Sequence, residues 1–317
     1  MTQNPVFVVN PKSHRVNTSG SVLSKIAVDY GDIPVVYFDG STSLSETLTP
    51  LLLQGKDTIY AEGGDGTVVA ALTSSIEALS QGGKLPQIGI LPGGSTNLTY
   101  HQLGLKTIDP ESLKRIINTG KAERIATHQA LLVRTSEMST PNVGFLLSTG
   151  SLARLMIYTQ ENLHGRTRGA VSIIRAILQL VLFARSTKFS DGLPVVRASQ
   201  FSTCAKSTAR TSIDETFSVF STFRELSLGL SPFWGRGDHQ IGHTQAVWPI
   251  RQMRLGILKA LFRGAGENLI PHGLTSRGCS GITFRSNGPV MLDGEDLPMP
   301  RDGTFEVSVS PELEFIR

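Results

Sequence analysis

Two glycine-rich stretches carry the residue types best suited to hold an anion. The first is Glu62-Gly63-Gly64-Asp65-Gly66-Thr67, and the second is Pro92-Gly93-Gly94-Ser95-Thr96-Asn97. Glycine has no Cβ, so it tolerates positive φ and lets backbone N–H groups converge on a phosphate. A helix that begins just after such a turn adds its positive N-terminal end to the same point. Together the two turns predict a phosphate site built mainly from backbone, although one alone is as typical of a tight strand-to-helix connection.

Neither stretch follows the two best-known phosphate patterns. No lysine follows the second glycine pair, as a P-loop requires, and neither stretch contains the GxGxxG spacing. If these stretches bind a nucleotide, they therefore do so with an architecture other than the P-loop or the GxGxxG turn. Asp65 is the natural carboxylate to position magnesium or phosphate, because the glycines on both sides leave it unshielded. The alternative is a turn aspartate that bonds its own backbone.

The elements that must position these stretches alternate between strand and helix. Apolar, β-branched runs predict strands at 5–9, 34–38, 58–61 and 87–91, and helical spacing predicts helices at 19–29, 43–53 and 67–79. Thr42 or Ser43 is available as the N-cap of the second helix. This alternation predicts a parallel, doubly wound sheet covered on both faces. Ligands bind beyond the carboxyl ends of such strands, where Asn10 and both glycine stretches fall.

The second half of the chain has a different character. After Gly120, short apolar runs are separated by polar and glycine-rich pieces, and only residues 151–186 are clearly helical. We therefore predict an α/β domain at 1–127 and a β-rich, sandwich-like domain with a helical insertion at 128–305. Residues 306–317 are free to pack back on the first domain.

Composition restricts the class of protein further. A chain of 317 residues suits two domains. The net charge of +4 is scattered, which argues against nucleic acid and gives only a weak preference for anionic ligands or membrane surfaces. The N-terminus shows no secretory signal. The most apolar run, 170–184, is interrupted by Arg175 and Gln179, so we expect an amphipathic helix there. Cys204 and Cys279 are far apart and lack metal-ligand spacing, so we expect a cytoplasmic protein.

Several motifs, in order, resemble a known family. Asn10-Pro11, the 63–67 turn, the 91–97 stretch and Val290-Met291-Leu292-Asp293-Gly294-Glu295 together look like the catalytic domain of the diacylglycerol and sphingosine lipid kinases. The resemblance implies an enzyme in which ATP sits between an α/β domain and a β-rich lipid-binding domain. Magnesium would assist transfer of the γ-phosphate to a lipid hydroxyl, with diacylglycerol as the favoured acceptor and phosphatidic acid as the product.

The resemblance also implies roles for particular residues. Asp65 would be the metal residue, Glu295 the general base and Asp293 its support. ATP would contact a set of small and polar residues: Asn10, Gly63, Gly64, Gly66, Thr67, Gly93, Gly94, Ser95, Thr96 and Asn97. Purely structural roles stay open for some of these residues. Asp293-Gly294 is a strong hairpin-turn signal on its own. Ser95 or Thr96 suits a helix N-cap, and Asn97 could simply hold its loop in shape.

The sequence departs from the family pattern at two places. Lys12-Ser13-His14-Arg15 stands where members usually carry Ser-Gly, and Arg251-Gln252 stands where we would place the acidic pair of a structural magnesium site, so we predict no such ion. Asp238, His239 and His243 have ligand-like spacing, but we favour a polar loop over a metal site.

Other functions and partners remain open at this point. The alternatives are NAD kinase, which shares the Gly-Gly-Asp-Gly turn, a sphingoid-base kinase, and an inactive nucleotide- or lipid-binding homologue. The expected partners are a lipid substrate and, peripherally, a membrane surface. A homodimer is compatible with this reading.

Overall fold

The computed structural model describes residues 3–94, 97–122, 124–162, 187–203, 211–226, 230–249 and 267–317. The chain forms two compact units, one of Met1–Gln129 with Ser310–Arg317 and the other of Ala130–Val309. Most of the predicted insertion beyond residue 162, including the 170–184 run, and the Arg251-Gln252 pair lie outside the described residues.

The N-terminal unit contains a six-stranded sheet in the order β2-β1-β3-β4-β17-β5. Its strands are β1 (Pro5–Val9), β2 (Val35–Tyr37), β3 (Thr58–Gly63), β4 (Gln87–Pro92), β5 (Ile125–His128) and β17 (Leu313–Ile316). In this order, each strand from β2 to β17 is parallel to the next one, and only the edge strand β5 is antiparallel to its neighbour β17. The predicted parallel sheet is therefore present, and the last strand of the chain lies inside it.

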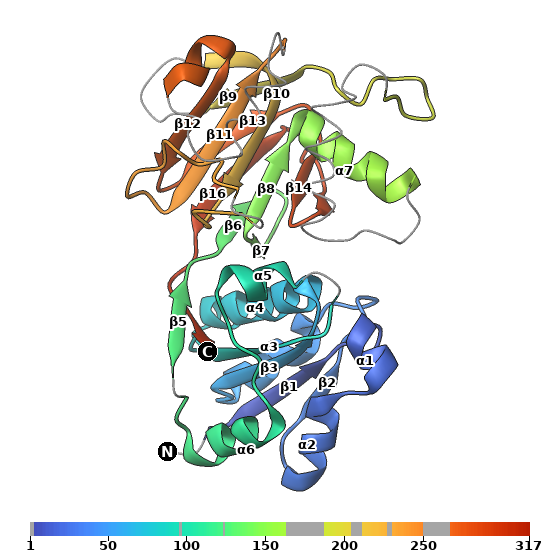
Figure 1. Ribbon diagram of the computed structural model, residues 1–317, viewed down its shortest axis with the longest axis vertical. Coiled ribbons are helices and arrows are strands. Elements are labelled where there is room, and N and C mark those ends of the chain that lie inside the picture. The colour runs from blue at the N-terminus through green and yellow to red at the C-terminus, as the bar shows by residue number, and fades with distance from the viewer. Residues whose placement is uncertain are drawn as a thin grey trace. The chain divides into compact units, whose positions relative to one another are not determined.

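Helices cover both faces of this sheet (Figure 1). They are α1 (His14–Ser19), α2 (Val22–Tyr30), α3 (Ser45–Leu53), α4 (Asp65–Ser80), α5 (Leu98–Gln102) and α6 (Pro110–Thr119). Val6 and Val8 of β1 join the apolar cluster of α3 and α4, whereas Phe7 and Val9 join the cluster of α2 and α6. This alternation follows from the two-residue period of a strand, which sends successive side chains to opposite faces.

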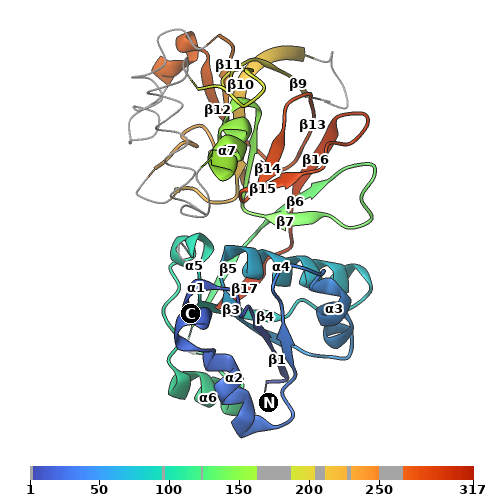
Figure 2. The same ribbon diagram turned by 90° about the vertical axis from the view of Figure 1, so that its right-hand side faces the viewer.

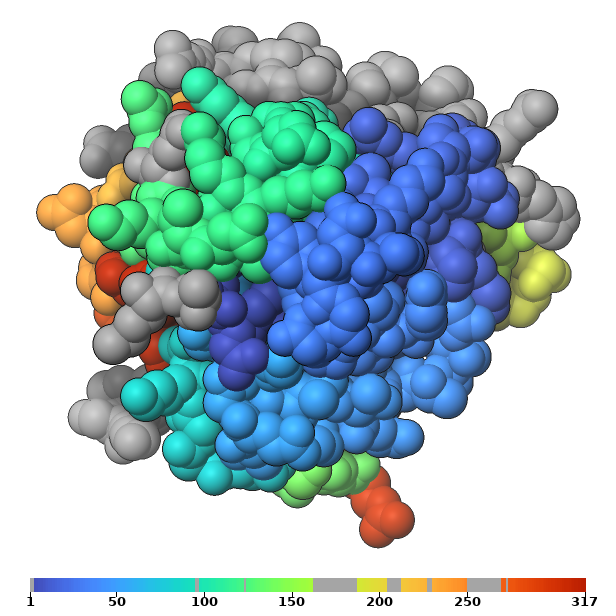
Figure 3. All heavy atoms as spheres, turned by 90° about the horizontal axis from the view of Figure 1, so that it is seen from below, coloured from blue at the N-terminus to red at the C-terminus, as the bar shows by residue number. Residues whose placement is uncertain are grey.

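Some local expectations were wrong. Helix α3 begins at Ser45 with Leu44 at its N-cap and no side-chain cap bond, so neither Thr42 nor Ser43 caps it. The sequence interpretation also missed α6, although Asp109 caps its first turn, Pro110 opens it and Gly120 ends it in the left-handed conformation. Figure 3, which looks onto this part of the unit, shows the blue surface of the first residues beside the green of α6.

The C-terminal unit is built on eleven strands joined into one sheet. They are β6 (Leu131–Arg134), β7 (Asn142–Gly144), β8 (Leu146–Thr149), β9 (Ser199–Thr203), β10 (Thr211–Ser221), β11 (Ile241–Val247), β12 (Leu274–Cys279), β13 (Ile282–Ser286), β14 (Val290–Leu292), β15 (Glu295–Leu297) and β16 (Thr304–Val309). The order is β15-β14-β8-β10-β9-β13-β16-β6-β7, with β11 between β10 and β12. The β-rich prediction holds, but the strands form one connected sheet and not two separate sandwich layers.

The strands of the C-terminal unit form a twisted sheet (Figure 2), and one of its apolar clusters is rich in aromatic side chains. Phe201, Phe220, Phe284 and Phe305 come from the adjacent strands β9, β10, β13 and β16 and share one buried cluster. The opposite face carries helix α7 (Gly150–Asn162), the described part of the predicted helical insertion, and a 3-10 turn spans Glu267–His272. Among the described residues, no helix is long and apolar enough to cross a bilayer.

Candidate functional site

The two glycine stretches pack directly against each other at the carboxyl ends of β3 and β4. The Gly93 N–H donates to the Gly63 carbonyl at 2.7 Å. A Cβ added to Gly93 would lie 3.1 Å from the Gly63 Cα, and one added to Gly94 would lie 2.7 Å from the Gly64 Cα. Real Cβ atoms essentially never come as close as the Gly94 separation and rarely as close as the Gly93 one, so glycine is what permits this contact between the loops.

The reason for glycine is therefore not the one that the sequence suggested. Gly63, Gly64, Gly66, Gly93 and Gly94 all lack positive φ. Close packing within or between the loops explains Gly63, Gly93 and Gly94, and a Cβ on Gly64 would only reach ordinary contact with Gly94, at 3.4 Å. Gly66 is exposed, and a Cβ there would meet nothing within 4 Å. Glycine in the first turn of α4 lowers the stability of the helix. The missing side chain of Gly66 leaves the backbone here accessible to a ligand, which would explain a glycine at this position.

Asn10 connects the end of β1 to the same loops. Its Nδ2 donates to the Thr67 Oγ1 at 3.0 Å, and its Oδ1 accepts from the Lys12 N–H at 2.9 Å. The Ser13 Oγ donates to the Asn10 carbonyl at 2.9 Å, and the Arg15 N–H donates to the Gly93 carbonyl at 2.9 Å. The Lys12 to Arg15 segment, which departs from the family pattern, is thus part of the framework of the site.

Asp65 holds the second loop through helix α5. Its Oδ2 accepts from the Leu98 N–H at 3.0 Å and its Oδ1 from the Thr99 N–H at 2.9 Å. These two donors belong to the first turn of α5, which otherwise lacks intrahelical acceptors. The carboxylate therefore caps a neighbouring helix and joins α4 to α5, a contact that neither sequence alternative included.

Asn97 closes the second loop. It adopts the left-handed conformation, with φ 47° and ψ 47°, immediately before α5. Its side chain accepts from the Gly94 N–H and donates to the Gly94 carbonyl, both at 2.9 Å. Of its two possible roles, holding the loop in shape is the one that these contacts support. Ser95 and Thr96 lie outside the described residues.

Glu62 is a site residue that the sequence interpretation did not single out. It is buried at the end of β3 and accepts from the Ser21 Oγ at 2.5 Å and from the N–H groups of Val22 and Leu23 at 2.9 and 3.0 Å. It thereby fixes the N-terminus of α2 beside the glycine loops. A charged residue at the end of an otherwise apolar strand was the available signal.

The Asp293-Gly294 pair forms a two-residue hairpin turn between β14 and β15. Both residues have positive φ, 50° and 91°, as the common hairpin turn requires. The Asp293 carboxylate accepts from the N–H groups of Phe145 at 2.9 Å and Leu146 at 2.8 Å. Glu295 opens β15 with its side chain exposed. Asp293 therefore anchors the hairpin to β8, and the role of Glu295 as a base stays a prediction.

The family of the N-terminal unit follows from comparison with known proteins. Residues 4–130 match the family model described as the diacylglycerol kinase catalytic domain. The likeness is to that catalytic domain and spans less than half of the chain. The match covers Asn10 and both glycine stretches, so the resemblance seen in the sequence is confirmed there.

Solved structures extend the likeness to the whole chain. A diacylglycerol kinase from Bacillus anthracis str. Sterne superposes with a TM-score of 0.61 at 12% identity, covering 99% of this chain and 97% of that one. A second protein from the same strain, provisionally assigned as a diacylglycerol kinase, superposes with a TM-score of 0.66 at 14% identity. The superposition covers 99% of this chain and 96% of that one. At these identities the likeness shows the fold alone. No curated protein matches the chain by sequence.

Beyond the diacylglycerol kinase domain, the C-terminal unit contains a buried carboxylate that sequence reasoning missed. Glu215 is fully buried and accepts from the Thr149 Oγ1 and the Ser218 Oγ, both at 2.6 Å, and from the Gln245 Nε2 at 3.2 Å. Burial raises the pKa of Glu215 above its ordinary value, since the low-dielectric interior disfavours the charged form.

The proposed polar loop around Asp238, His239 and His243 is only partly a loop. His243 lies in β11, buried and stacked on Phe220 at 4.1 Å, and its Nδ1 accepts from the Arg277 Nε at 3.1 Å. Burial lowers the pKa of His243 to about 3, so the ring is neutral. Within the described ranges, no group of three His, Cys, Asp or Glu residues could hold a metal ion.

Proposed function

We propose that the chain is an ATP-dependent lipid kinase that transfers the γ-phosphate to the hydroxyl of diacylglycerol. The family of residues 4–130 supports kinase chemistry. The observation that carries the proposal is the packing of Gly63 and Gly64 on Gly93 and Gly94 at the carboxyl ends of adjacent parallel strands. This is where open α/β sheets bind their ligands.

The residues of the N-terminal unit fit a polyphosphate. Gly66 leaves the first turn of α4 open on its exposed side, and the positive end of this helix favours negative charge there. Phosphoryl transfer needs aligned phosphates and charge stabilisation more than covalent help from the protein. We therefore assign binding of the ATP phosphates to the backbone of residues 63–67 and 93–94.

The donor set does not fit a magnesium site held by protein side chains alone. Each Asp65 oxygen already accepts a backbone N–H, and the described residues offer no cluster of acidic or histidine ligands around it. We propose that magnesium arrives as its complex with ATP, where it neutralises phosphate charge. Asp65 then acts by holding α5 and the second loop in place.

We further propose that Glu295 accepts the proton of the lipid hydroxyl. Its side chain is exposed at the start of β15, as a base that meets a second substrate must be. Asp293 fixes the hairpin that carries Glu295 through the N–H groups of Phe145 and Leu146. On this proposal Asp293 is a positioning residue.

Incubation of the full chain with labelled ATP and magnesium tests the function. Diacylglycerol micelles, sphingosine and NAD are offered as separate acceptors, and labelled phosphatidic acid is the expected product. Label only in NADP would assign a NAD kinase, and ATP binding without any product would assign an inactive homologue. Glu295→Gln should keep ATP binding and abolish transfer, whereas the matched control Asp296→Asn, on the next exposed residue of β15, should remain active.

A further inference from the structure

A cavity lies within the C-terminal unit, more than one hundred residues along the chain from the glycine loops. Its volume is about 400 Å³, and its walls include Arg224, Glu225, Ser231, Trp234, Arg236 and Asp238. Pockets for small molecules commonly range over a few hundred Å³. None of these residues takes part in the proposed kinase chemistry.

Arg236 is a rigid cation at this cavity. Its side chain is buried, and its Nε donates to the His239 carbonyl at 2.7 Å, its Nη1 to the Thr222 carbonyl at 2.9 Å and its Nη2 to the Gln240 carbonyl. A guanidinium has five N–H groups, so both terminal nitrogens keep further donors. Three backbone carbonyls thus hold the positive charge in place.

Arg224 brings a second guanidinium to the same cavity. It is exposed, and its Nη1 donates to the Gly237 carbonyl at 3.3 Å. Burial lowers the pKa of Arg236, and the nearby charge of Arg224 lowers it further. Among the residues that the structure describes, neither arginine forms an ion pair. Two neighbouring guanidinium groups repel each other, so an oxyanion between them would be stabilised by both.

The remaining walls favour a ligand with hydroxyl groups over a bare polyanion. Glu225 and Asp238 line the same cavity as the arginines. Carboxylates accept hydrogen bonds from hydroxyls and repel additional negative charge. Trp234 adds an aromatic wall, on which the C–H face of a polyol can pack, and Ser231 adds a small polar group.

We propose that this cavity binds a phosphorylated polyol, with the phosphate at Arg224 and Arg236 and the hydroxyls at Glu225 and Asp238. The same chemistry occurs in a soluble polyol phosphate and in the headgroup of a phospholipid. The site is separate from the proposed transfer of phosphate, and its test measures binding and not turnover.

Tryptophan fluorescence provides the measurement. The chain has two tryptophans, so Trp248→Phe leaves Trp234 as the reporter. We expect a saturable change with myo-inositol 1-phosphate, and a weaker one with inorganic phosphate. Vesicles of phosphatidylcholine with and without phosphatidylinositol show whether the ligand is the soluble form or the headgroup. Calorimetric titration of the unmodified chain gives the same answer without the tryptophan substitution.

Arg224→Ala is the critical variant, because Arg224 is exposed and its loss should not affect folding. Removing one charged hydrogen-bond donor to phosphate should weaken binding about tenfold or more. Arg301→Ala, at another exposed arginine of this unit, should bind normally. The proposal is overturned if no probe gives saturable binding, if Arg224→Ala binds as tightly as the unmodified chain, or if inorganic phosphate binds as well as the polyol phosphate.

Discussion

Asp65 shows how the contacts of one residue can redirect a functional assignment. A carboxylate between two glycines suggests a metal ligand, yet both oxygens accept N–H groups from the first turn of α5. The Asp65 contacts, together with the Asn97 bonds to Gly94, hold the second glycine loop against the first. The two roles make different predictions for conservative substitution.

Asp65→Ala removes both acceptors and should lower the free energy of unfolding by about 1–2 kcal/mol, as the loss of a helix cap does. It should also reduce kcat/KM for the proposed transfer at least tenfold. Asp65→Asn keeps one of the two acceptor oxygens, so we expect it to recover part of both losses. If Asp65→Asn is as inactive as Asp65→Ala while its stability is restored, the carboxylate charge itself is required and the positioning role is wrong.

Glu215 predicts a pH dependence of stability. Its pKa is raised in the folded state by burial, so its favourable contribution is complete below the ordinary value of 4.5 and is lost as the pH rises through the folded-state pKa. Glu215→Gln cannot ionise. Urea unfolding from pH 4 to pH 8 should therefore show the unmodified chain losing stability relative to Glu215→Gln as the pH rises. A constant difference across this range would show that the pKa of Glu215 is the same in the folded and unfolded chain, and would contradict the prediction.

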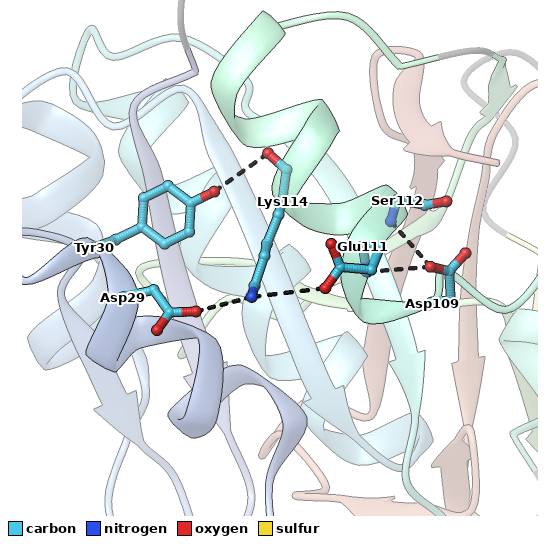
Figure 4. Close-up of polar contacts among 6 residues, drawn as sticks. All are labelled: Asp29, Tyr30, Asp109, Glu111, Ser112 and Lys114. Carbon is cyan, nitrogen blue, oxygen red and sulfur yellow. Dashed lines mark hydrogen bonds and ion pairs between the residues drawn. The ribbon is translucent and has the colours of Figure 1, made fainter.

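Helix α6 is stabilised by a cap from the residue just before it and by contacts with helix α2, which is distant in the sequence. The Asp109 Oδ1 accepts from the N–H groups of Glu111 and Ser112 at 3.1 and 3.0 Å. Figure 4 shows Lys114 of the same helix between Asp29 and Glu111, with the Tyr30 hydroxyl donating to its carbonyl. The cap begins the helix, and the Lys114–Asp29 ion pair connects it to α2.

Substitutions in this helix should separate the two contributions. Asp109→Ala leaves two N–H donors without the cap, so we expect a melting temperature lower by a few degrees, measured by circular dichroism. Lys114→Met breaks only exposed ion pairs, which contribute little in water, and should leave the melting temperature nearly unchanged. A larger effect for Lys114→Met than for Asp109→Ala would contradict this ranking.

The two units of the molecule differ in how the chain builds them. The C-terminal unit is one continuous segment, Ala130–Val309, whereas the N-terminal unit needs Ser310–Arg317 to complete it. Strand β17 lies between β4 and β5, and its Leu313, Phe315 and Ile316 are almost fully buried. Residues 310–317 therefore complete the sheet of the N-terminal unit, although most of that unit lies before residue 130.

Truncation tests this dependence. A chain ending at Val309 should lose cooperative unfolding of the N-terminal unit and all ATP binding, because β4 and β5 lose their shared partner and the apolar core is opened. Residues 130–309 expressed alone should fold. Limited proteolysis followed by mass spectrometry distinguishes the units, and a protease-resistant N-terminal unit in the truncated chain would contradict the prediction.

The sequence by itself determined the strand and helix alternation of the first unit and the place of both glycine stretches at strand ends. Those features are local, because an apolar period of two or of 3.6 and a turn rich in glycine act over a few residues. The same locality let Asn10, Asp65 and Gly93 be named as site residues before any contact was known.

Only the tertiary structure decided what those residues touch. Asp65 meets Leu98 and Thr99 from more than thirty positions away, Glu62 caps α2 from forty positions away, and β17 pairs with β4 across most of the chain. No local pattern specifies such pairs, because they arise when the packing of whole helices and strands brings the groups together. The glycines illustrate the difference most clearly, since the sequence indicated freedom in φ whereas the fold uses their missing Cβ.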